Sequence, residues 1–102
     1  MLDTGLKTID LEKIQNVFAS HPEVEQVIVY GSRAKGTYKP ASDVDLTLVG
    51  DKLNLTIQQK IETELDDLLL PYKFDISIYN QISKADLIQH IERVGKPFFI
   101  KN

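Results

Sequence analysis

Residues 31–36 read GSRAKG and residues 42–46 read SDVDL. The first stretch follows the segment 24–30, VEQVIVY, whose β-branched residues predict a buried strand that runs into a tight turn at Gly31. The second stretch opens the segment 43–49, DVDLTLV, which alternates at a period of two residues and predicts a second strand. We therefore expect two strands, with a Gly-Ser turn at the end of the first and two aspartates at the start of the second.

Apolar residues at helical spacing predict three helices beside these strands. Asp10 is expected to cap the first helix, and Ser83, which begins a capping-box spacing, is expected to cap the last. The helices are predicted at residues 10–20, 53–69 and 83–94, and two further strands at residues 74–79 and 97–100. The prediction is one α/β (α+β) domain over residues 1–102, a small mixed β-sheet with helices packed on it.

The composition narrows the classes of function. The chain has 0 Cys, which excludes disulfides, thiolate zinc sites and a cysteine nucleophile. Its net charge is -3, from 12 Lys and Arg against 15 Asp and Glu, and no basic patch gives direct evidence for a nucleic-acid partner. No apolar run is long enough to cross a bilayer and the N-terminus lacks the pattern of a signal peptide, so we expect a cytoplasmic protein with no membrane partner.

Three aspartates are candidates for a metal site. Asp43 and Asp45 are two residues apart on a strand and so project from one face, and Asp75 lies on the third predicted strand. If the two strands are neighbours, the carboxylates converge, and two charges about 4 Å apart repel by roughly 4 kcal/mol at an effective dielectric near 20. A divalent cation relieves this repulsion. Oxygen ligands without a nearby His or Cys predict Mg²⁺, which completes its coordination with water and phosphate oxygens.

The turn before the second strand supplies candidate phosphate ligands. Gly31 lets the backbone bend sharply and approach a ligand, and Ser32 offers a hydroxyl beside free backbone amides. Arg33 is a candidate fork-shaped phosphate donor and Lys35 a candidate point charge. We therefore predict a nucleotide-binding set of Gly31, Ser32, Arg33 and Lys35.

Each feature alone also has an ordinary structural explanation. A Gly-Ser pair after a strand is usually only a turn, and aspartates at alternate positions often lie on a solvated strand face. The same holds for the histidines, because His21 and His90 are more often surface or boundary residues than ligands. The combination of turn, spacing and strand placement is what favours a functional site over these explanations.

The two stretches GSRAKG and SDVDL closely resemble the signature of the minimal nucleotidyltransferases, members of the DNA polymerase beta-like superfamily. The order of helices and strands extends the resemblance over nearly the whole chain. The resemblance implies that Gly31 and Ser32 hold the terminal phosphates and that Asp43 and Asp45 bridge two Mg²⁺ ions. It further implies that Asp75 helps to hold one metal and activates the acceptor hydroxyl.

The resemblance also implies an activity and a partner. Two-metal transfer of a nucleoside monophosphate, AMP from ATP, would release pyrophosphate. Family members of this size look like the antitoxin half of a toxin-antitoxin pair, in which the small enzyme modifies a tyrosine of an all-helical HEPN protein. The expected partners are thus a nucleoside triphosphate and a HEPN-type protein, and the chain itself is a candidate oligomer.

Two other classes of function remain open on the sequence. One is a non-catalytic nucleotide-binding or partner-binding module that neutralises its partner by occlusion, and the other is a regulatory Mg²⁺ or phosphate sensor. The third carboxylate, Asp75, favours the enzyme, because a nucleotide clamp does not need help in activating an acceptor. The tail residues Phe98, Phe99 and Ile100 fit two roles equally, a docking surface for the partner or an anchor of the tail to the core.

Overall fold

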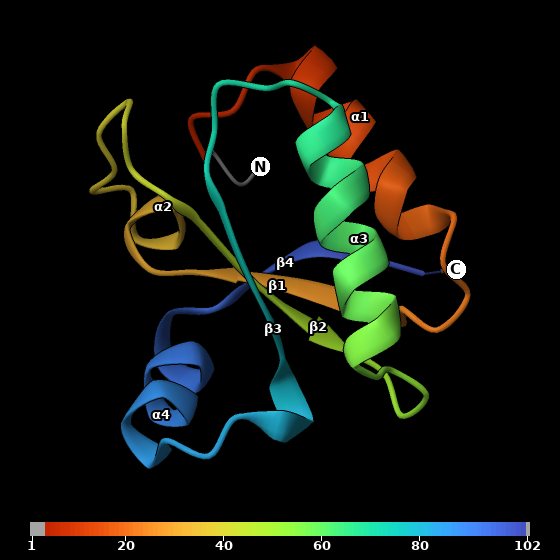
Figure 1. The fold of residues 1–102 in the computed structure, drawn as a ribbon. Helices are drawn as coiled ribbons and strands as arrows, with labels where there is room; N and C mark the ends of the chain where they lie inside the picture. The colour runs from red at the N-terminus through yellow and green to blue at the C-terminus, as the bar shows by residue number, and fades with distance from the viewer. Residues whose placement is uncertain (1–3, 102) are drawn as a thin grey trace.

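A four-stranded mixed sheet with helices on both faces forms the framework of the computed structural model, which describes residues 4–101 (Figure 1). The elements in chain order are α1 (Thr8–Ala19), β1 (Gln26–Tyr30), α2 (Ser32–Lys35), β2 (Val44–Val49), α3 (Leu55–Asp67), β3 (Phe74–Ile78), the 3₁₀ turn η1 (Tyr79–Gln81), α4 (Ala85–Val94) and β4 (Lys96–Ile100). The strand order is β3-β2-β1-β4, in which β1 is antiparallel to both β2 and β4, and β2 is parallel to β3. The predicted small mixed sheet is confirmed.

The two faces of the sheet differ in composition and cover. The helices α1 and α3 pack side by side on one face, whereas α2 and α4 lie on the other side of the sheet (Figure 1). The face under α1 and α3 carries the apolar residues of the strands, and it forms most of the hydrophobic core. Its strand residues are Val27, Val29, Leu46, Leu48, Ile76 and Ile78. Because strand residues alternate between faces, the polar residues at the intervening positions are directed towards α4.

The helix ends differ from the sequence-based expectation. Helix α1 begins at Thr8, and Lys7 is its N-cap without a side-chain bond. Asp10 lies in the first turn instead, where it is buried and its Oδ2 accepts a hydrogen bond of 2.9 Å from the hydroxyl of Tyr72. The predicted cap at Ser83 is likewise wrong, since α4 is preceded by Lys84 and no side chain caps it. A tertiary partner for Asp10 therefore replaces the local capping bond.

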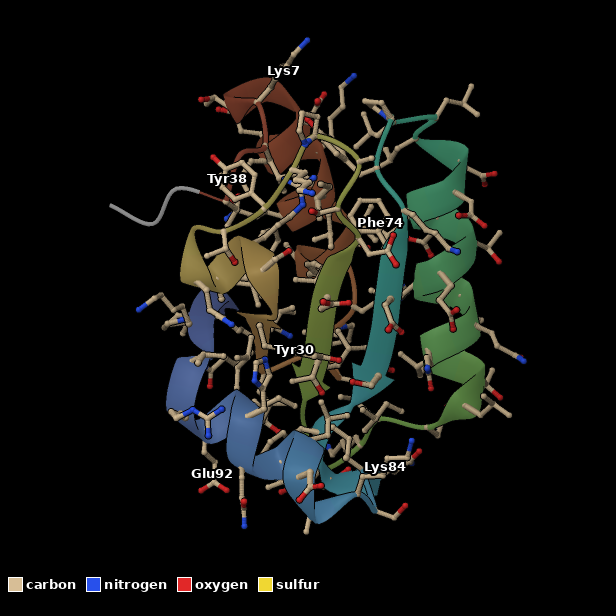
Figure 2. All side chains as sticks on the ribbon, turned by 90° about the vertical axis from the view of Figure 1, so that its left-hand side faces the viewer. Lys7, Tyr30, Tyr38, Phe74, Lys84 and Glu92 are labelled. Atoms are coloured by element: carbon tan, nitrogen blue, oxygen red, sulfur yellow. The ribbon has the colours of Figure 1, made fainter. Side chains whose placement is uncertain are left out.

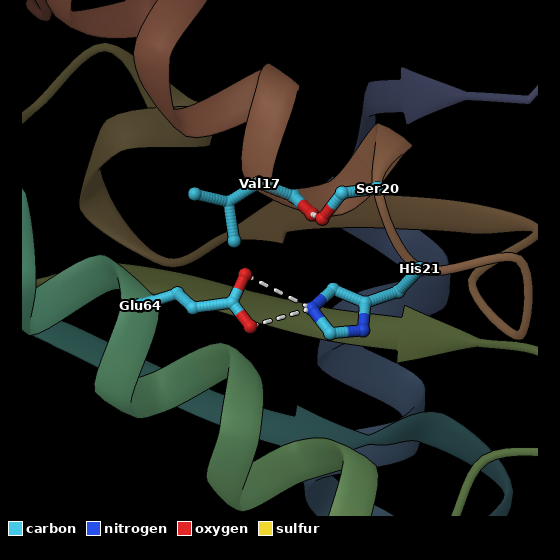
Figure 3. Close-up of polar contacts among 4 residues, drawn as sticks. All are labelled: Val17, Ser20, His21 and Glu64. Carbon is cyan, nitrogen blue, oxygen red and sulfur yellow. Dashed lines mark hydrogen bonds and ion pairs between the residues drawn. The ribbon is translucent and has the colours of Figure 1, made fainter.

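His21 is a structural residue rather than the surface residue expected from the sequence. It is 9% exposed, and its Nε2 lies 3.0 Å from Oε2 of Glu64, which connects the end of α1 to α3 (Figure 3). The hydroxyl of Ser20, next to it, donates a 2.7 Å hydrogen bond to the carbonyl of Val17 in the last turn of α1. The α1–α3 layer is thus closed by polar contacts at this end of the helices.

The tail forms the predicted edge strand, β4. Phe98 is 6% exposed and packs edge-to-face on Phe18, with 6.2 Å between ring centroids, and Phe99 lies 6.1 Å from the same ring. Ile100 is 59% exposed. Of the two roles considered for the tail, the structure shows the anchor for both phenylalanines, because they complete the core beside α1.

Among residues 4–101, no helix has the length and apolarity needed to cross a membrane.

Candidate active site

A polar row crosses the sheet on the face that α4 partly covers. Asp45 of β2 is paired in register with Tyr30 of β1 on one side and with Asp75 of β3 on the other. Figure 2 looks onto this face and places Tyr30 near the middle of the sheet, beside α4. Because the register aligns the three positions, Asp45 and Asp75 are side-by-side neighbours, as the sequence predicted on condition that their strands pair.

The charges of the three predicted carboxylates act on one another. Burial raises the pKa of Asp45, and the negative charges of Asp75 and Asp43 raise that pKa further. His90 of α4 lies close enough to oppose the shift. Asp43 and Asp75 are exposed, whereas Asp45 is half-buried. Asp45, the half-buried residue among the three, is therefore the carboxylate whose charged form is most disfavoured by its neighbours.

The carboxylate oxygens are the type of ligand that a hard divalent cation prefers, but the protein supplies too few of them to complete its coordination. Within the described part of the chain, no group of three or more His, Asp or Glu side chains lies close enough together to hold a metal ion without further ligands. Mg²⁺ is commonly held by one or two carboxylates together with substrate phosphates and water. The neighbouring Asp45 and Asp75 suit that mode of binding, in which the nucleotide completes the coordination.

Gly31 joins the phosphate turn to the carboxylates. Its φ of 73° lies in the left-handed region, and a Cβ at this position would overlap Oδ2 of Asp45. The carbonyl of Gly31 accepts bonds from the amides of Ala34 and Lys35, which closes the short helix α2 directly after the turn. The structure therefore brings the predicted turn and the predicted carboxylate together, and the positive φ favours glycine at this position.

The four predicted phosphate ligands differ in burial, and one of them is bound to the backbone. Ser32 is half-buried at the start of α2, and Lys35 is exposed in its last turn. Arg33 is only 1% exposed, and its guanidinium donates to the backbone carbonyls of Thr4 and Ser42, at 2.8 and 2.9 Å. The expectation that Arg33 is a phosphate donor is not supported by this geometry, because its N–H groups are committed to the backbone.

A second pair of polar residues follows the carboxylates on β2 and β3, and the sequence did not predict it as part of the site. Thr47 and Ser77 are register neighbours, one step along from Asp45 and Asp75, and both hydroxyls are buried without a hydrogen bond of standard geometry among the described residues. Thr47 is 0% exposed. The alternation of two residues, from Asp45 to Thr47 and from Asp75 to Ser77, is the sequence signal for this pair.

Tyr30 and His90 complete the surroundings of the carboxylates. Their rings are 6.1 Å apart and nearly perpendicular. Burial raises the pKa of Tyr30, the nearby hydroxyl of Ser77 opposes that shift, and the charges of Asp75 and Asp45 reinforce it. No local pattern places His90 here, because its position depends on how α4 packs on the sheet.

Comparison with known proteins by sequence identifies a family. The family model described as "Polymerase beta, Nucleotidyltransferase" matches residues 12–102. A protein of Methanocaldococcus jannaschii named "Putative protein adenylyltransferase" is 37% identical over 76 residues, which cover 72% of this chain and 77% of the relative.

Two solved structures share the fold at low sequence identity. A chain of a toxin-antitoxin structure with AMP-PNP has a TM-score of 0.72 and 19% identity, and the match covers 90% of this chain and 74% of that one. A chain in the structure of a complex between tri-AMPylated Shewanella oneidensis HEPN toxin and MNT antitoxin has a TM-score of 0.68 and 15% identity, and the match covers 94% of this chain and 74% of that one. With a family model that covers nine-tenths of its residues and the Gly-Ser turn set against the strand aspartates, the chain belongs to the polymerase beta nucleotidyltransferase family.

Proposed function

We propose that this nucleotidyltransferase transfers AMP from ATP to a tyrosine hydroxyl of a HEPN-type helical protein and acts as the antitoxin of that pair. The name of the Methanocaldococcus jannaschii relative supports protein adenylylation as the reaction. The similar folds from a toxin-antitoxin structure with AMP-PNP and from a complex with a tri-AMPylated HEPN toxin support the nucleotide and the partner.

The observation that carries the proposal is the contact between the turn and the carboxylate row. A Cβ at Gly31 would overlap Oδ2 of Asp45, and Asp75 lies directly beside Asp45 in the sheet. A triphosphate at the turn would therefore lie next to the carboxylates, where a divalent cation can neutralise both. Without that cation, phosphate and carboxylates repel each other.

In the proposed site, Gly31 and Ser32 bind the terminal phosphates, and the exposed Lys35 adds positive charge nearby. Asp43, Asp45 and Asp75 hold Mg²⁺, with two ions expected. The bound metal would neutralise charge on the attacking and leaving oxygens.

The proposed reaction is a single displacement at the α-phosphorus of ATP. The acceptor oxygen forms a bond to this phosphorus, the bond from the phosphorus to the oxygen that bridges to the β-phosphate breaks, and pyrophosphate leaves. The proton of the acceptor hydroxyl passes to the carboxylate of Asp75. Because Asp75 is exposed at the edge strand β3, an acceptor side chain from a second protein can reach it.

The test uses ATP labelled at the α-phosphate, the purified protein, and a HEPN protein encoded next to it. Labelled partner protein is expected with Mg²⁺ and none with EDTA. Asp75→Asn should abolish labelling, whereas the matched control Asp66→Asn, an exposed aspartate on α3, should label as the wild type does. Labelling that persists in EDTA or in Asp75→Asn would contradict the assigned site.

The same experiment distinguishes AMP transfer from the alternative function, a non-catalytic module that neutralises its partner by occlusion. If the protein binds ATP in a metal-dependent way and inhibits its partner, yet no label is transferred, neutralisation by occlusion is the better function. Isothermal titration with ATP, with and without Mg²⁺, provides the binding measurement for this comparison.

A further inference from the structure

We propose that Arg33 is a positioning residue that fixes Asp43 at the site by holding the carbonyl of Ser42. The inference rests on the proposed function, because it assumes that Asp43 contributes to metal binding. The place of Arg33 in the motif suggests phosphate binding. The role proposed here is different, because Arg33 would act through Asp43.

The contacts of the guanidinium define a clamp on the loop between α2 and β2. Its Nε and Nη2 both donate to the carbonyl of Ser42, at 3.2 and 2.9 Å, and Nη2 also lies 3.4 Å from the carbonyl of Pro40. Nη1 donates to the carbonyl of Thr4, at 2.8 Å. The flat, forked shape of the guanidinium allows one buried group to bind three separate carbonyls.

Aromatic rings fix the direction of the guanidinium. Its carbon lies 5.2 Å from the ring centre of Tyr38 and 5.6 Å from that of Tyr72. The hydroxyl of Tyr72 is itself bound to Asp10, at 2.9 Å. Arg33 is therefore held between the loop that joins α2 to β2 and the segment that precedes α1, and it cannot turn towards the phosphate turn without breaking these contacts.

Asp43 lies between two fixed neighbours. On one side, Ser42 is held by Arg33, and its hydroxyl also accepts a 2.8 Å hydrogen bond from the amide of Lys39. On the other side, the amide of Val44 donates a 2.8 Å hydrogen bond to the carbonyl of Lys73, which starts the pairing of β2 with β3. Without Arg33, Ser42 would keep only its bonds with Lys39, and the exposed Asp43 carboxylate would be held less firmly.

The test compares Arg33→Met and Arg33→Lys with the wild type. The methionine removes all N–H donors at similar length, and the lysine keeps the charge but lacks the fork. Two quantities are measured by titration: the Mg²⁺ concentration that gives half-maximal ATP binding, and the Kd for ATP at saturating Mg²⁺. Circular dichroism confirms that each variant is folded.

Both variants are expected to raise the half-saturating Mg²⁺ concentration by about 10- to 100-fold, while the Kd for ATP at saturating Mg²⁺ stays within about threefold, since the affected group orients a metal ligand. The control Glu64→Gln removes the carboxylate charge beside His21, at the opposite end of β1 from Gly31, and should leave both quantities unchanged. Wild-type protein that binds ATP equally well without Mg²⁺ would instead defeat the proposed function itself.

Other outcomes overturn the clamp. If Arg33→Lys behaves as the wild type and Arg33→Met weakens ATP binding at every Mg²⁺ concentration, the side chain acts as a phosphate charge. Unchanged half-saturation in both folded variants also rejects the proposal. If neither variant folds, Tyr38→Leu decides, because it keeps Arg33 and removes one of the two rings that fix the direction of the guanidinium; a half-saturating concentration equal to that of the wild type would then reject the clamp.

Discussion

The two faces of the sheet show how one strand serves stability and chemistry at adjacent residues. Leu46 points into the core under α1 and α3 and is fully buried, whereas its neighbour Asp45 points the other way into the carboxylate row. The apolar face is closely covered and electrically neutral. The polar face, on the side of α2 and α4, keeps like charges together with the buried hydroxyl of Thr47, which has no hydrogen-bond partner among the described residues. The difference indicates that the second face is kept at a cost in stability, as functional sites often are.

The largest expected effect concerns the apolar face. Leu46→Ala should lower the free energy of unfolding by about 2–5 kcal/mol, because it leaves a cavity in a fully buried region. Chemical denaturation measures the change, and AMP transfer per folded molecule should remain close to that of the wild type. A stability change well below this range would show that the α1–α3 face is loosely packed.

Asp45→Asn tests the neighbouring residue on the polar face. AMP transfer should fall at least about 100-fold, roughly 2.7 kcal/mol in the activation free energy, because an amide is a poor ligand for a hard cation. The rate of label transfer at saturating Mg²⁺ measures the effect. If Asp45→Asn turns over at the wild-type rate, the assignment of Asp45 as a metal ligand is wrong.

The same variant should have the opposite effect on stability in metal-free buffer. The raised pKa of Asp45 means that the folded protein binds its proton more tightly than the unfolded chain does. The free energy of unfolding therefore falls as the pH rises from the ordinary range of a free aspartate through the raised pKa. Above that window, Asp45→Asn should be more stable than the wild type by up to about 1 kcal/mol, the scale of partly exposed charge pairs.

Denaturation in EDTA at a series of pH values measures this difference, and Asp66→Asn on the exposed surface of α3 serves as the control. In the variant, the part of the pH dependence that arises from Asp45 should disappear. A variant that is less stable than the wild type at neutral pH without metal would show that the carboxylate makes a favourable contact that outweighs the repulsion.

Thr47→Val is expected to have the smallest effect. The hydroxyl is fully buried and unpartnered among the described residues, so replacing it with a methyl group of similar size should be neutral or stabilising, by up to about 1 kcal/mol. The change in thermal midpoint measures it. A loss of stability would indicate that the Thr47 hydroxyl is bound to an internal water.

Several parts of the site could be predicted from the sequence because they depend on local rules. The period of a strand places Asp43 and Asp45 on one face, and a glycine after a β-branched run marks the turn. The resemblance of this Gly-Ser turn and Asp-x-Asp pair to the minimal nucleotidyltransferase signature then implied the family. Asp75 needed one further condition, the pairing of its strand with β2, which the structure meets.

The remaining features depend on contacts between residues far apart in the sequence. Arg33 follows Ser32 directly, yet its guanidinium turns to carbonyls of the loop and the N-terminal segment, because buried N–H groups require partners that only the folded chain supplies. His90 and Tyr30 meet only when α4 packs on the sheet. The sequence by itself determined the residue types of the site and their spacing along each strand. The tertiary structure decided which side chains face the carboxylates and which hold the loop, because direction depends on packing and hydrogen-bond satisfaction across the whole fold.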